Sequence, residues 1–421
     1  MDLIALILFI VVIAVSFFRK SNAGILAFAI GAIAVRIFSL TDKDLLGAIS
    51  TSMFTILVGI TLLFAAINST GALELLAKKI VALAGDRVWI IPIAIYAAGF
   101  TIAGIGPGAI PALAIIPGLA VSVAVAVGYD PLMLALIGEC GLMAGRMTPI
   151  TPEGALITEV AASAGIENVM PAILVSKTLV TIIFSVVLFI IFKGYKLTKP
   201  QNKMDFKSLE KFNGKQLIAL SSIVVLMILL IFFKVNIGLA AFISAAALFI
   251  IGVADDGACI KAMPWSTIVM VMGMGTLLSI VDTVGGIDLM STALSSIMSA
   301  STAAPIMGIS AGLLSMVSSA LGVVYPTMMP MCASIANQLG NVHPVALMAA
   351  VGAGGSLSGI TPLSTGGALA LAALGSNLKD FDKDKESKAF VQLFIIAGIG
   401  LLITAIVSAL FFNFIANTIM G

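Results

Sequence analysis

The sequence has few charged residues for its length. Of 421 residues, 22 are Lys or Arg and 20 are Asp or Glu, which is 10% of the chain; a soluble domain carries about 25%. Charge this sparse does not cover the surface of a water-soluble globule, and a net charge of +2 provides no basic face for nucleic acid. The composition therefore excludes a soluble enzyme, a disordered protein and a nucleic-acid-binding protein.

Histidine and cysteine are also scarce. His343 is the single histidine, which excludes an HExxH motif or a cluster of histidine ligands. Cys140, Cys259 and Cys332 lie in or beside apolar runs without paired spacing, so they predict neither a disulfide framework nor a zinc site. An enzyme working inside a membrane would need a metal or a nucleophile–base pair. We therefore expect no cofactor and no enzymatic activity.

What the sequence does have is long hydrophobic runs, which make up most of its 60% of hydrophobic residues. A helix that spans a membrane needs about 20 apolar residues. Runs of this kind lie at 3–18, 22–40, 46–67, 172–192, 216–233, 236–253, 265–283 and 389–416, with amphipathic stretches at 71–84 and 286–298. The pattern predicts an all-α polytopic membrane protein.

Four further apolar stretches are interrupted by polar residues, Gly or Pro. The stretches 88–127 and 303–340 are broken near their middles, at Gly104–Gly108 and Ser318–Gly322, and we predict a helical hairpin for each. The stretches 131–164 and 344–375 are broken at 148–154 and 361–367, and we predict a broken helix for each. Irregular backbone at membrane depth is tolerated only where protein buries it or where it lines a wet cavity.

The basic residues orient the chain. The polar linker 193–215 concentrates lysines, namely Lys193, Lys196, Lys199, Lys203, Lys207, Lys211 and Lys215. Cytoplasmic loops collect Lys and Arg, so we place this linker in the cytoplasm. Most of the other basic residues then share its side if both hairpins are re-entrant; the exceptions are Arg36, Lys43, Lys177 and Lys234 outside, and Arg146 within the membrane. This predicts a protein of the cytoplasmic (inner) membrane with ten spans and two re-entrant hairpins. Both termini are predicted to lie outside, on the side opposite the cytoplasm.

The second half of the sequence repeats landmarks of the first at an offset of 213–214 residues. Asn22 matches Asn236, Asn68 matches Asp282, Asp130-Pro matches His343-Pro, and Thr148-Pro matches Thr361-Pro. We predict a first repeat over 1–193, a cytoplasmic linker over 194–215 and a second repeat over 216–421. Each holds five spans and one hairpin, and the odd number of spans inverts the second copy. Inverted repeats with interrupted helices in matching positions are typical of secondary transporters, with the site near the bilayer midplane.

The four interruptions supply the candidate site. Amide ends of half-helices suit a carboxylate, unwound carbonyls suit a cation, and hydroxyl groups lie in the same stretches. The substrate-binding candidates are Gly106, Gly108, Arg146, Thr148, Thr151, Ser319, Thr361, Ser364 and Thr365. The candidates for a sodium site are Gly104, Gly106, Thr148, Glu153, Ser318, Gly322 and Thr361.

Arg146 lies beside the first break, where an unpaired charge is costly. Glu139, two turns earlier, and Glu153, inside the break, are its potential partners. Arg146 either pairs internally, binds a substrate carboxylate, or does both. Glu139 and Glu153 are also the candidates for carrying a coupling proton. The second repeat has Gly359 where the first has Arg146, so we expect an asymmetric site.

These motifs resemble the ion transporter superfamily, in particular its malonate/dicarboxylate carriers (MatC-type) and more distantly the sodium/dicarboxylate symporters. The segments that carry the resemblance are the run beginning at Leu57, Arg87-Val-Trp-Ile-Ile-Pro, Gly104 to Pro117, and the two Thr-Pro breaks. The resemblance implies a scaffold that holds a transport domain of two hairpins and two broken helices. It also implies elevator-like alternating access with sodium or proton coupling. Related gluconate-type permeases share this architecture, which keeps a sugar acid open as substrate.

We therefore expect a secondary active transporter of a small organic anion, a di- or monocarboxylate. A cation/proton antiporter is the alternative, with Glu139 and Glu153 as the exchanging acids. The membrane subunit of a binding-protein-dependent carboxylate transporter is another. The expected partners are the anion, the lipid bilayer and a second copy of the chain in a homodimer, with no nucleic acid.

Overall fold

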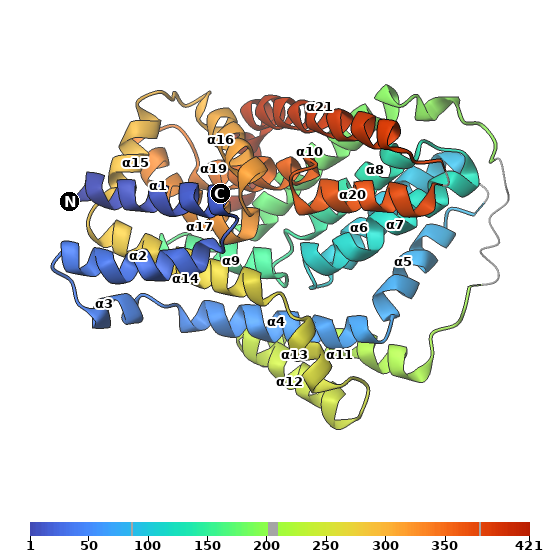
Figure 1. Ribbon diagram of the computed structural model, residues 1–421, viewed down its shortest axis with the longest axis horizontal. Coiled ribbons are helices and arrows are strands. Elements are labelled where there is room, and N and C mark those ends of the chain that lie inside the picture. The colour runs from blue at the N-terminus through green and yellow to red at the C-terminus, as the bar shows by residue number, and fades with distance from the viewer. Residues whose placement is uncertain (86, 201–208, 379) are drawn as a thin grey trace.

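The computed structural model describes residues 1–85, 87–200, 209–378 and 380–421, and the described residues form helices and connecting loops without strands (Figure 1). Within these residues, eight helical segments are long and apolar enough to cross a membrane. Shorter apolar helices, such as Ala23–Ile37 and Pro131–Gly145, lie between them. The predicted class, an all-α polytopic membrane protein, is confirmed.

The first half of the chain forms ten α-helices. They are α1 (Asp2–Arg19), α2 (Ala23–Ile37), α3 (Asp42–Gly47), α4 (Thr51–Ser69), α5 (Ala72–Ala82), α6 (Ile91–Gly104), α7 (Ala109–Val127), α8 (Pro131–Gly145), α9 (Pro152–Ser163) and α10 (Met170–Ile191). The span predicted at 46–67 begins later than expected. Ser50 starts α4 by accepting a hydrogen bond from the Met53 amide at 3.0 Å, and Thr41 and Asp44 form a capping box that starts the separate helix α3.

The second half forms twelve α-helices among the described residues. They are α11 (Gly214–Ile231), α12 (Ile237–Ile250), α13 (Asp256–Ala262), α14 (Trp265–Thr283), α15 (Gly286–Ser295), α16 (Ala303–Val317), α17 (Tyr325–Met328), α18 (Met331–Leu339), α19 (Pro344–Leu357), α20 (Thr365–Asn377), α21 (Lys383–Val407) and α22 (Asn413–Met420). A π-helical turn, η4 (Ala320–Val324), leads into α17, and Pro330 separates α17 from α18. The second arm of this hairpin is therefore less regular than the first. Residues 201–208 of the predicted linker lie outside the described residues.

Local geometry recurs at the landmarks of the predicted repeat. Asn22 and Asn236 each cap a helix by accepting a hydrogen bond from the glycine amide two residues on, at 2.9 Å in both cases. Gly71 and Gly285 each precede a short amphipathic helix with φ of 72° and 83°, a conformation that favours glycine. Residues 213 or 214 positions apart thus form the same caps and turns. The division into two repeats of five spans stays a prediction.

The helices pack in two groups. In the scaffold group, α1–α4 and α11–α14, α2 packs on α14 and α4 packs on α12, so each half contacts the other (Figure 1). The amphipathic helices α5 and α15 contact both groups, α5 through α4 and α6, and α15 through α1 and α18. In the hairpin group, α6–α10 and α16–α22, α6 packs on α8, α16 packs on α19, and α10 contacts both α8 and α19. The two broken helices therefore lie within the hairpin group, with their breaks close to the hairpin tips.

Candidate functional site

The first break is a turn held by a threonine cap. Helix α8 ends at Gly145 and α9 begins at Pro152, a residue suited to the first helical position because it lacks an N–H. The Thr151 hydroxyl donates to the Arg146 carbonyl oxygen at 2.5 Å and accepts from the Gly154 amide at 3.0 Å. These bonds keep Thr151 in the turn, and its side chain is fully buried.

The second break repeats this turn with one difference. The Ser364 hydroxyl donates to the carbonyl oxygens of Gly359 and Thr361, which are the counterparts of Arg146 and Thr148. Helix α20 begins at Thr365, and no side chain among the described residues caps its first amides. The amide end of α20 is therefore available to an anion, whereas the Gly154 amide of α9 is already bonded.

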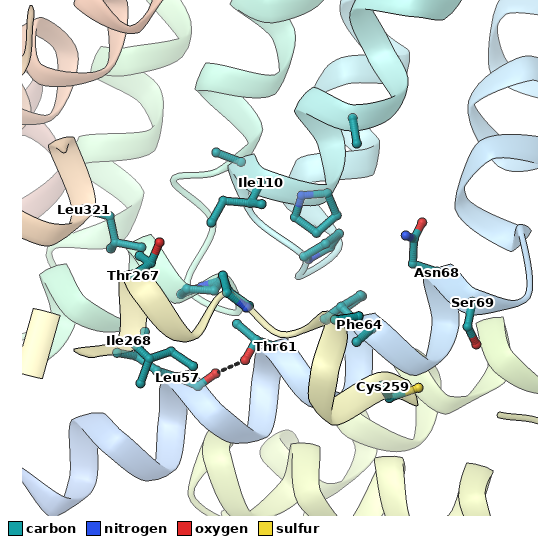
Figure 2. Close-up of a pocket in the computed structure, with 18 of the residues that line it drawn as sticks. Leu57, Thr61, Phe64, Asn68, Ser69, Ile110, Cys259, Thr267, Ile268 and Leu321 are labelled. Atoms are coloured by element: carbon teal, nitrogen blue, oxygen red, sulfur yellow. Dashed lines mark hydrogen bonds between the residues drawn. The ribbon is translucent and has the colours of Figure 1, made fainter. Parts of the chain in front are cut away.

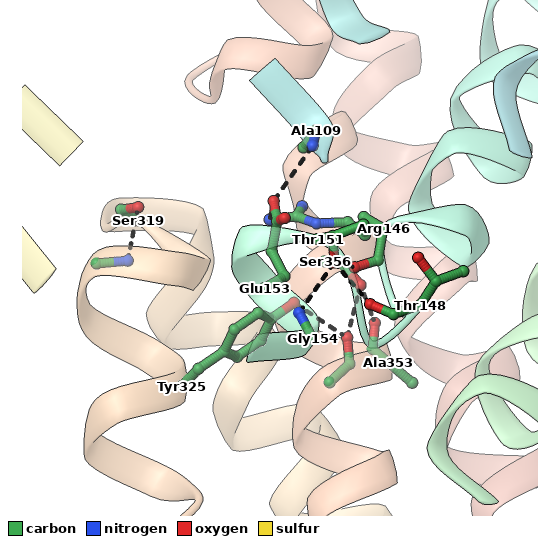
Figure 3. A network of polar contacts seen from close by, with 12 residues as sticks. Ala109, Arg146, Thr148, Thr151, Glu153, Gly154, Ser319, Tyr325, Ala353 and Ser356 are labelled. Carbon is green, nitrogen blue, oxygen red and sulfur yellow. Dashed lines mark hydrogen bonds and ion pairs between the residues drawn. The ribbon is translucent and has the colours of Figure 1, made fainter. Parts of the chain in front are cut away.

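Arg146 and Glu153 form an ion pair inside the first break (Figure 3). The Nη2 atom of Arg146 lies 2.8 Å from Oε1 of Glu153, with 11% and 2% of the two side chains exposed. The same Oε1 accepts a hydrogen bond from the Ala109 amide, at the start of α7, at 3.2 Å. Of the two predicted partners for Arg146, Glu153 is therefore the one in contact. The Nε of Arg146 and the Oε2 of Glu153 have no hydrogen-bond partner.

The first hairpin tip is fitted closely to this pair. Gly108 has φ of 73°, and a side chain there would collide with Glu153 and Pro152. Gly106, with φ of 136°, faces the Phe64 ring of α4 instead. The Thr148 hydroxyl joins tip and break by donating to the Gly104 carbonyl oxygen at 2.6 Å. Glycines are thus needed here for close packing of the tip.

The second half carries glycines where the first half carries the ion pair. Gly359 and Gly366 stand 213 residues after Arg146 and Glu153. A cleft of about 820 Å³ opens over this region. Its lining includes the predicted site residues Arg146, Glu153, Ser318, Ser319, Ser364 and Thr365, together with Gly359 and Gly366. The predicted asymmetry between the halves is present as one charged and one glycine-lined side.

The other predicted ligands do not line this cleft. Its wall does not include Gly104, Gly106, Gly108, Thr148, Thr151, Thr361, Gly322 or Glu139. The amide of Gly322 donates to the Ser319 hydroxyl at 3.1 Å, so Ser319 also acts as a cap, for η4 (Figure 3). The sequence indicates where the helices are interrupted. It does not distinguish hydroxyl groups that hold a turn from hydroxyl groups that face the cleft.

The Glu139 carboxylate lies against Gly366 of the second break, and the ion pair of Arg146 is with Glu153 instead. The Glu139 side chain is fully buried in α8, and neither carboxylate oxygen has a hydrogen-bond partner in the part of the chain that the structure describes. A side chain at Gly366 would meet both Oε2 of Glu139 and the Gly359 carbonyl oxygen. The hydroxyl of Thr361, in the same break, is likewise buried without a partner. Unpaired buried oxygens of this kind call for a proton or a cation.

Lys177, which the charge pattern places toward the outside, lies inside the protein and not in an exposed loop. Its side chain is fully buried in α10, and Nζ donates to the Ala353 carbonyl oxygen of α19 at 3.1 Å. Its position within the apolar run 172–192 was a usable signal, because a charge inside a span marks a functional site more often than an anchor. Tyr325, fully buried in α17, was also missed; its hydroxyl donates to the Gly352 carbonyl oxygen at 3.4 Å.

A second cavity, of about 440 Å³, lies on the other side of Glu153. Figure 2 shows Thr61 and Phe64 of α4 on one side of it and Ile110 of α7 on the other. This cavity and the cleft share five lining residues, namely Ala109, Ile110, Glu153, Thr267 and Leu321. The Glu153 side chain and the start of α7 therefore form part of the wall shared by the two spaces.

Comparison with known proteins assigns the family. The profile of the family CitMHS, described as citrate transporter, matches residues 4–352, which is most of the chain. The chain belongs to the CitMHS family. No match was found among curated proteins. The superfamily expected from the sequence is confirmed, while the specific likeness to malonate carriers is not.

Two solved structures share the fold at low sequence identity. Neisseria gonorrhoeae MtrF, described with a class of antimetabolite efflux pumps, is 12% identical with a TM-score of 0.58, covering 90% of this chain and 84% of that one. The Alcanivorax borkumensis YdaH transporter is 13% identical with a TM-score of 0.58, covering 91% and 89%. Because it belongs to the CitMHS family and its described residues hold eight helical segments able to cross a membrane, this chain is a multi-pass membrane transporter and not an enzyme.

Proposed function

We propose that this chain is a secondary active transporter that carries a small organic anion across the cytoplasmic membrane, driven by sodium or protons. The observation that supports it best is the cleft, where the Arg146 guanidinium lies across from an uncapped helix end and a set of hydroxyl groups. Both features attract carboxylates. Since the family is described as citrate transporter, citrate is the first substrate to test.

The anion is proposed to bind between the two breaks. Arg146 would take one carboxylate, and the amides of Thr365 and Gly366 with the hydroxyl groups of Ser318 and Ser319 would take another. The position of Glu153 supports this assignment of the two carboxylate sites. In the first half, the Glu153 carboxylate itself accepts a hydrogen bond from the Ala109 amide at the start of α7. The equivalent place in the second half holds Gly366, which leaves room for a ligand carboxylate.

The coupling ion is proposed to act behind the anion, at Glu139 and the second break. The unpartnered oxygens of Glu139 and Thr361 support this position for either sodium or a proton. The sodium candidates Gly104, Gly106, Ser318 and Gly322 at the hairpin tips, and Thr148 in the first break, remain proposals. Glu153 is the second proton candidate because it faces both cavities.

The repeats over 1–193 and 216–421, joined by the cytoplasmic linker 194–215, are proposed to be inverted, with both termini outside. The scaffold group would remain fixed while the hairpin group moves as a unit, in elevator-like alternating access. A homodimer is proposed as the functional unit. The packing of α6 on α8 and of α16 on α19 supports motion of the hairpin group as a unit, with α5 and α15 as the helices that contact both groups.

Uptake into proteoliposomes tests the proposed function. Purified protein should accumulate labelled citrate, a C4-dicarboxylate, malonate or gluconate when a sodium or proton gradient is applied, and less without it. Transport by the purified chain alone would also dismiss the need for a solute-binding partner. Sodium-driven proton flux without accumulation of any anion would contradict the proposal and favour the cation/proton antiporter.

A further inference from the structure

Lys177 is a buried cation that the anion site alone does not explain. Its side chain is fully buried, yet Nζ makes a single hydrogen bond to the described residues, with the Ala353 carbonyl oxygen as acceptor. An ammonium group has three N–H donors and needs acceptors or an opposite charge when water is absent. The surroundings of Lys177 therefore fit a neutral amine better than an unpaired ammonium.

The charges around Lys177 come from α8 and its break. Arg146 and the Cys140 thiol lie close enough to influence it, and Glu153 already neutralises Arg146. The Glu139 carboxylate of α8 lies against Gly366 of the second break. Glu159 of α9 is hydrogen-bonded to Ser50 instead. A proton added to Lys177 would thus have no counter-charge of its own.

The remaining helices around Lys177 contribute uncharged groups. From α6, the Tyr96 hydroxyl is hydrogen-bonded to Thr181, one turn along α10, at 2.8 Å. Helix α19, α22 and residues 390–407 of α21 carry no charged side chain. Besides the Glu139 carboxylate of α8, an anion bound in the cleft is therefore the available source of negative charge.

The cleft lies close enough to supply that charge. Ser356 of α19 lines the cleft, and its hydroxyl lies 3.5 Å from the same Ala353 carbonyl oxygen that accepts from Lys177. Arg146 lines the same cleft as Ser356, and Figure 3 draws both residues together with Ala353. One carbonyl group thus separates the Lys177 amine from a hydroxyl group in the cleft wall.

We propose that Lys177 is a proton-coupling residue, which takes up a proton when a carboxylate anion binds beside Arg146 and gives it up when the anion leaves. This rests on the proposed anion site. The neutral amine and a proton from water form the ammonium, and the reverse step returns the proton on the other side of the membrane. Coulomb attraction between anion and ammonium links the two events, and the linkage is reciprocal. A proton is therefore carried with each anion.

The test measures proton uptake during citrate binding to purified protein, with a pH-sensitive dye in weak buffer, and citrate affinity across pH. Wild-type protein should take up about one proton per citrate. Because protonation and citrate binding favour each other, the affinity for citrate should fall about tenfold for each unit of pH increase in the coupled range. Lys177→Gln keeps an N–H donor for Ala353 but cannot titrate, so uptake and pH dependence should both disappear while citrate exchange continues. Lys177→Met is the second variant.

Thr181→Val is the matched control, because it removes a buried polar group from the same helix and should leave proton uptake at the wild-type value. Undiminished uptake in both Lys177 variants would overturn the proposal. Unfolding of both would also overturn it, by assigning Lys177 a purely structural role. Absence of binding by any carboxylate to folded wild-type protein would instead remove the proposed function, and this inference with it.

Discussion

At the scale of single residues, the Arg146–Glu153 pair sets the charge of the cleft. Removing one partner of a buried pair typically costs about 3–5 kcal/mol, because the other charge stays buried without compensation, whereas removing both is often close to neutral. The pair is nearly enclosed, with 11% and 2% of the side chains exposed. Stability and anion binding should therefore respond differently to single and double substitutions.

We expect Arg146→Gln to lower stability by about 3 kcal/mol and to abolish citrate binding. The double variant Arg146→Gln/Glu153→Gln should recover most of the stability but not the binding, since the cation that attracts the carboxylate is still missing. Thermal unfolding in detergent and calorimetric titration with citrate would measure the two effects. Restored binding in the double variant would show that Arg146 serves only to hold the break.

The same residues show how far the sequence could predict the site. The scarcity of charge singled out Arg146 and its two potential partners, and the structure places Glu153 in contact with it. The hydroxyl groups were less predictable, because Thr151 lies in the same motif whether it caps a helix or binds a ligand. Lys177 was missed because one lysine near the end of an apolar run is compatible with a side chain that reaches the interface.

At the scale of helices, glycine allows each broken helix to approach its hairpin. Gly141 of α8 lies against the Tyr96 carbonyl oxygen of α6, and Gly354 of α19 lies against the Gly308 carbonyl oxygen of α16. The two contacts are equivalent, since 141 and 354 are 213 residues apart. Small residues at such contacts let membrane helices pack at short range.

Gly141→Ala and Gly354→Ala should each destabilise the protein by about 1–3 kcal/mol, because the added methyl group forces the backbones apart. Gly118→Ala in α7 is the matched control: no atom lies within 4 Å of its added methyl group, and alanine favours a helix. Thermal unfolding of the three variants compares them directly. Equal stability of all three would contradict the role of glycine at these contacts.

Helices and breaks were the most predictable elements, because apolar run length and Gly or Pro punctuation directly reflect what a bilayer requires. The short elements were not, and α3, α13 and η4 show why. Thr41 and Asp255 start α3 and α13 through side-chain caps that involve only a few residues. A π-helical turn such as η4 has no sequence signal of its own and depends on packing against α14 and α17.

At the scale of the whole molecule, the arrangement of helices is compatible with one rigid group moving past another. Each half contributes helices to both groups, so neither group is a sequence-continuous domain. The 213-residue offset was visible in the sequence, but which helices share a group depends on contacts between the halves. One contact between the groups is the hydrogen bond between the Ser50 hydroxyl, at the N-cap of α4, and the Glu159 carboxylate of α9, with 2.5 Å between Oγ and Oε1.

That contact allows a direct test of the proposed elevator-like motion. Cysteines at Ser50 and Glu159, joined by a short thiol cross-linker, should abolish citrate uptake because the scaffold group is then tied to the hairpin group. Citrate binding should persist, since the cleft residues are untouched, and cleavage of the linker should restore uptake. Each single cysteine variant treated with the same reagent serves as control for the lost hydrogen bond. Undiminished uptake in the cross-linked protein would mean that this interface does not slide, and that access to the cleft is controlled nearer the site, by the Glu153 wall between the two cavities.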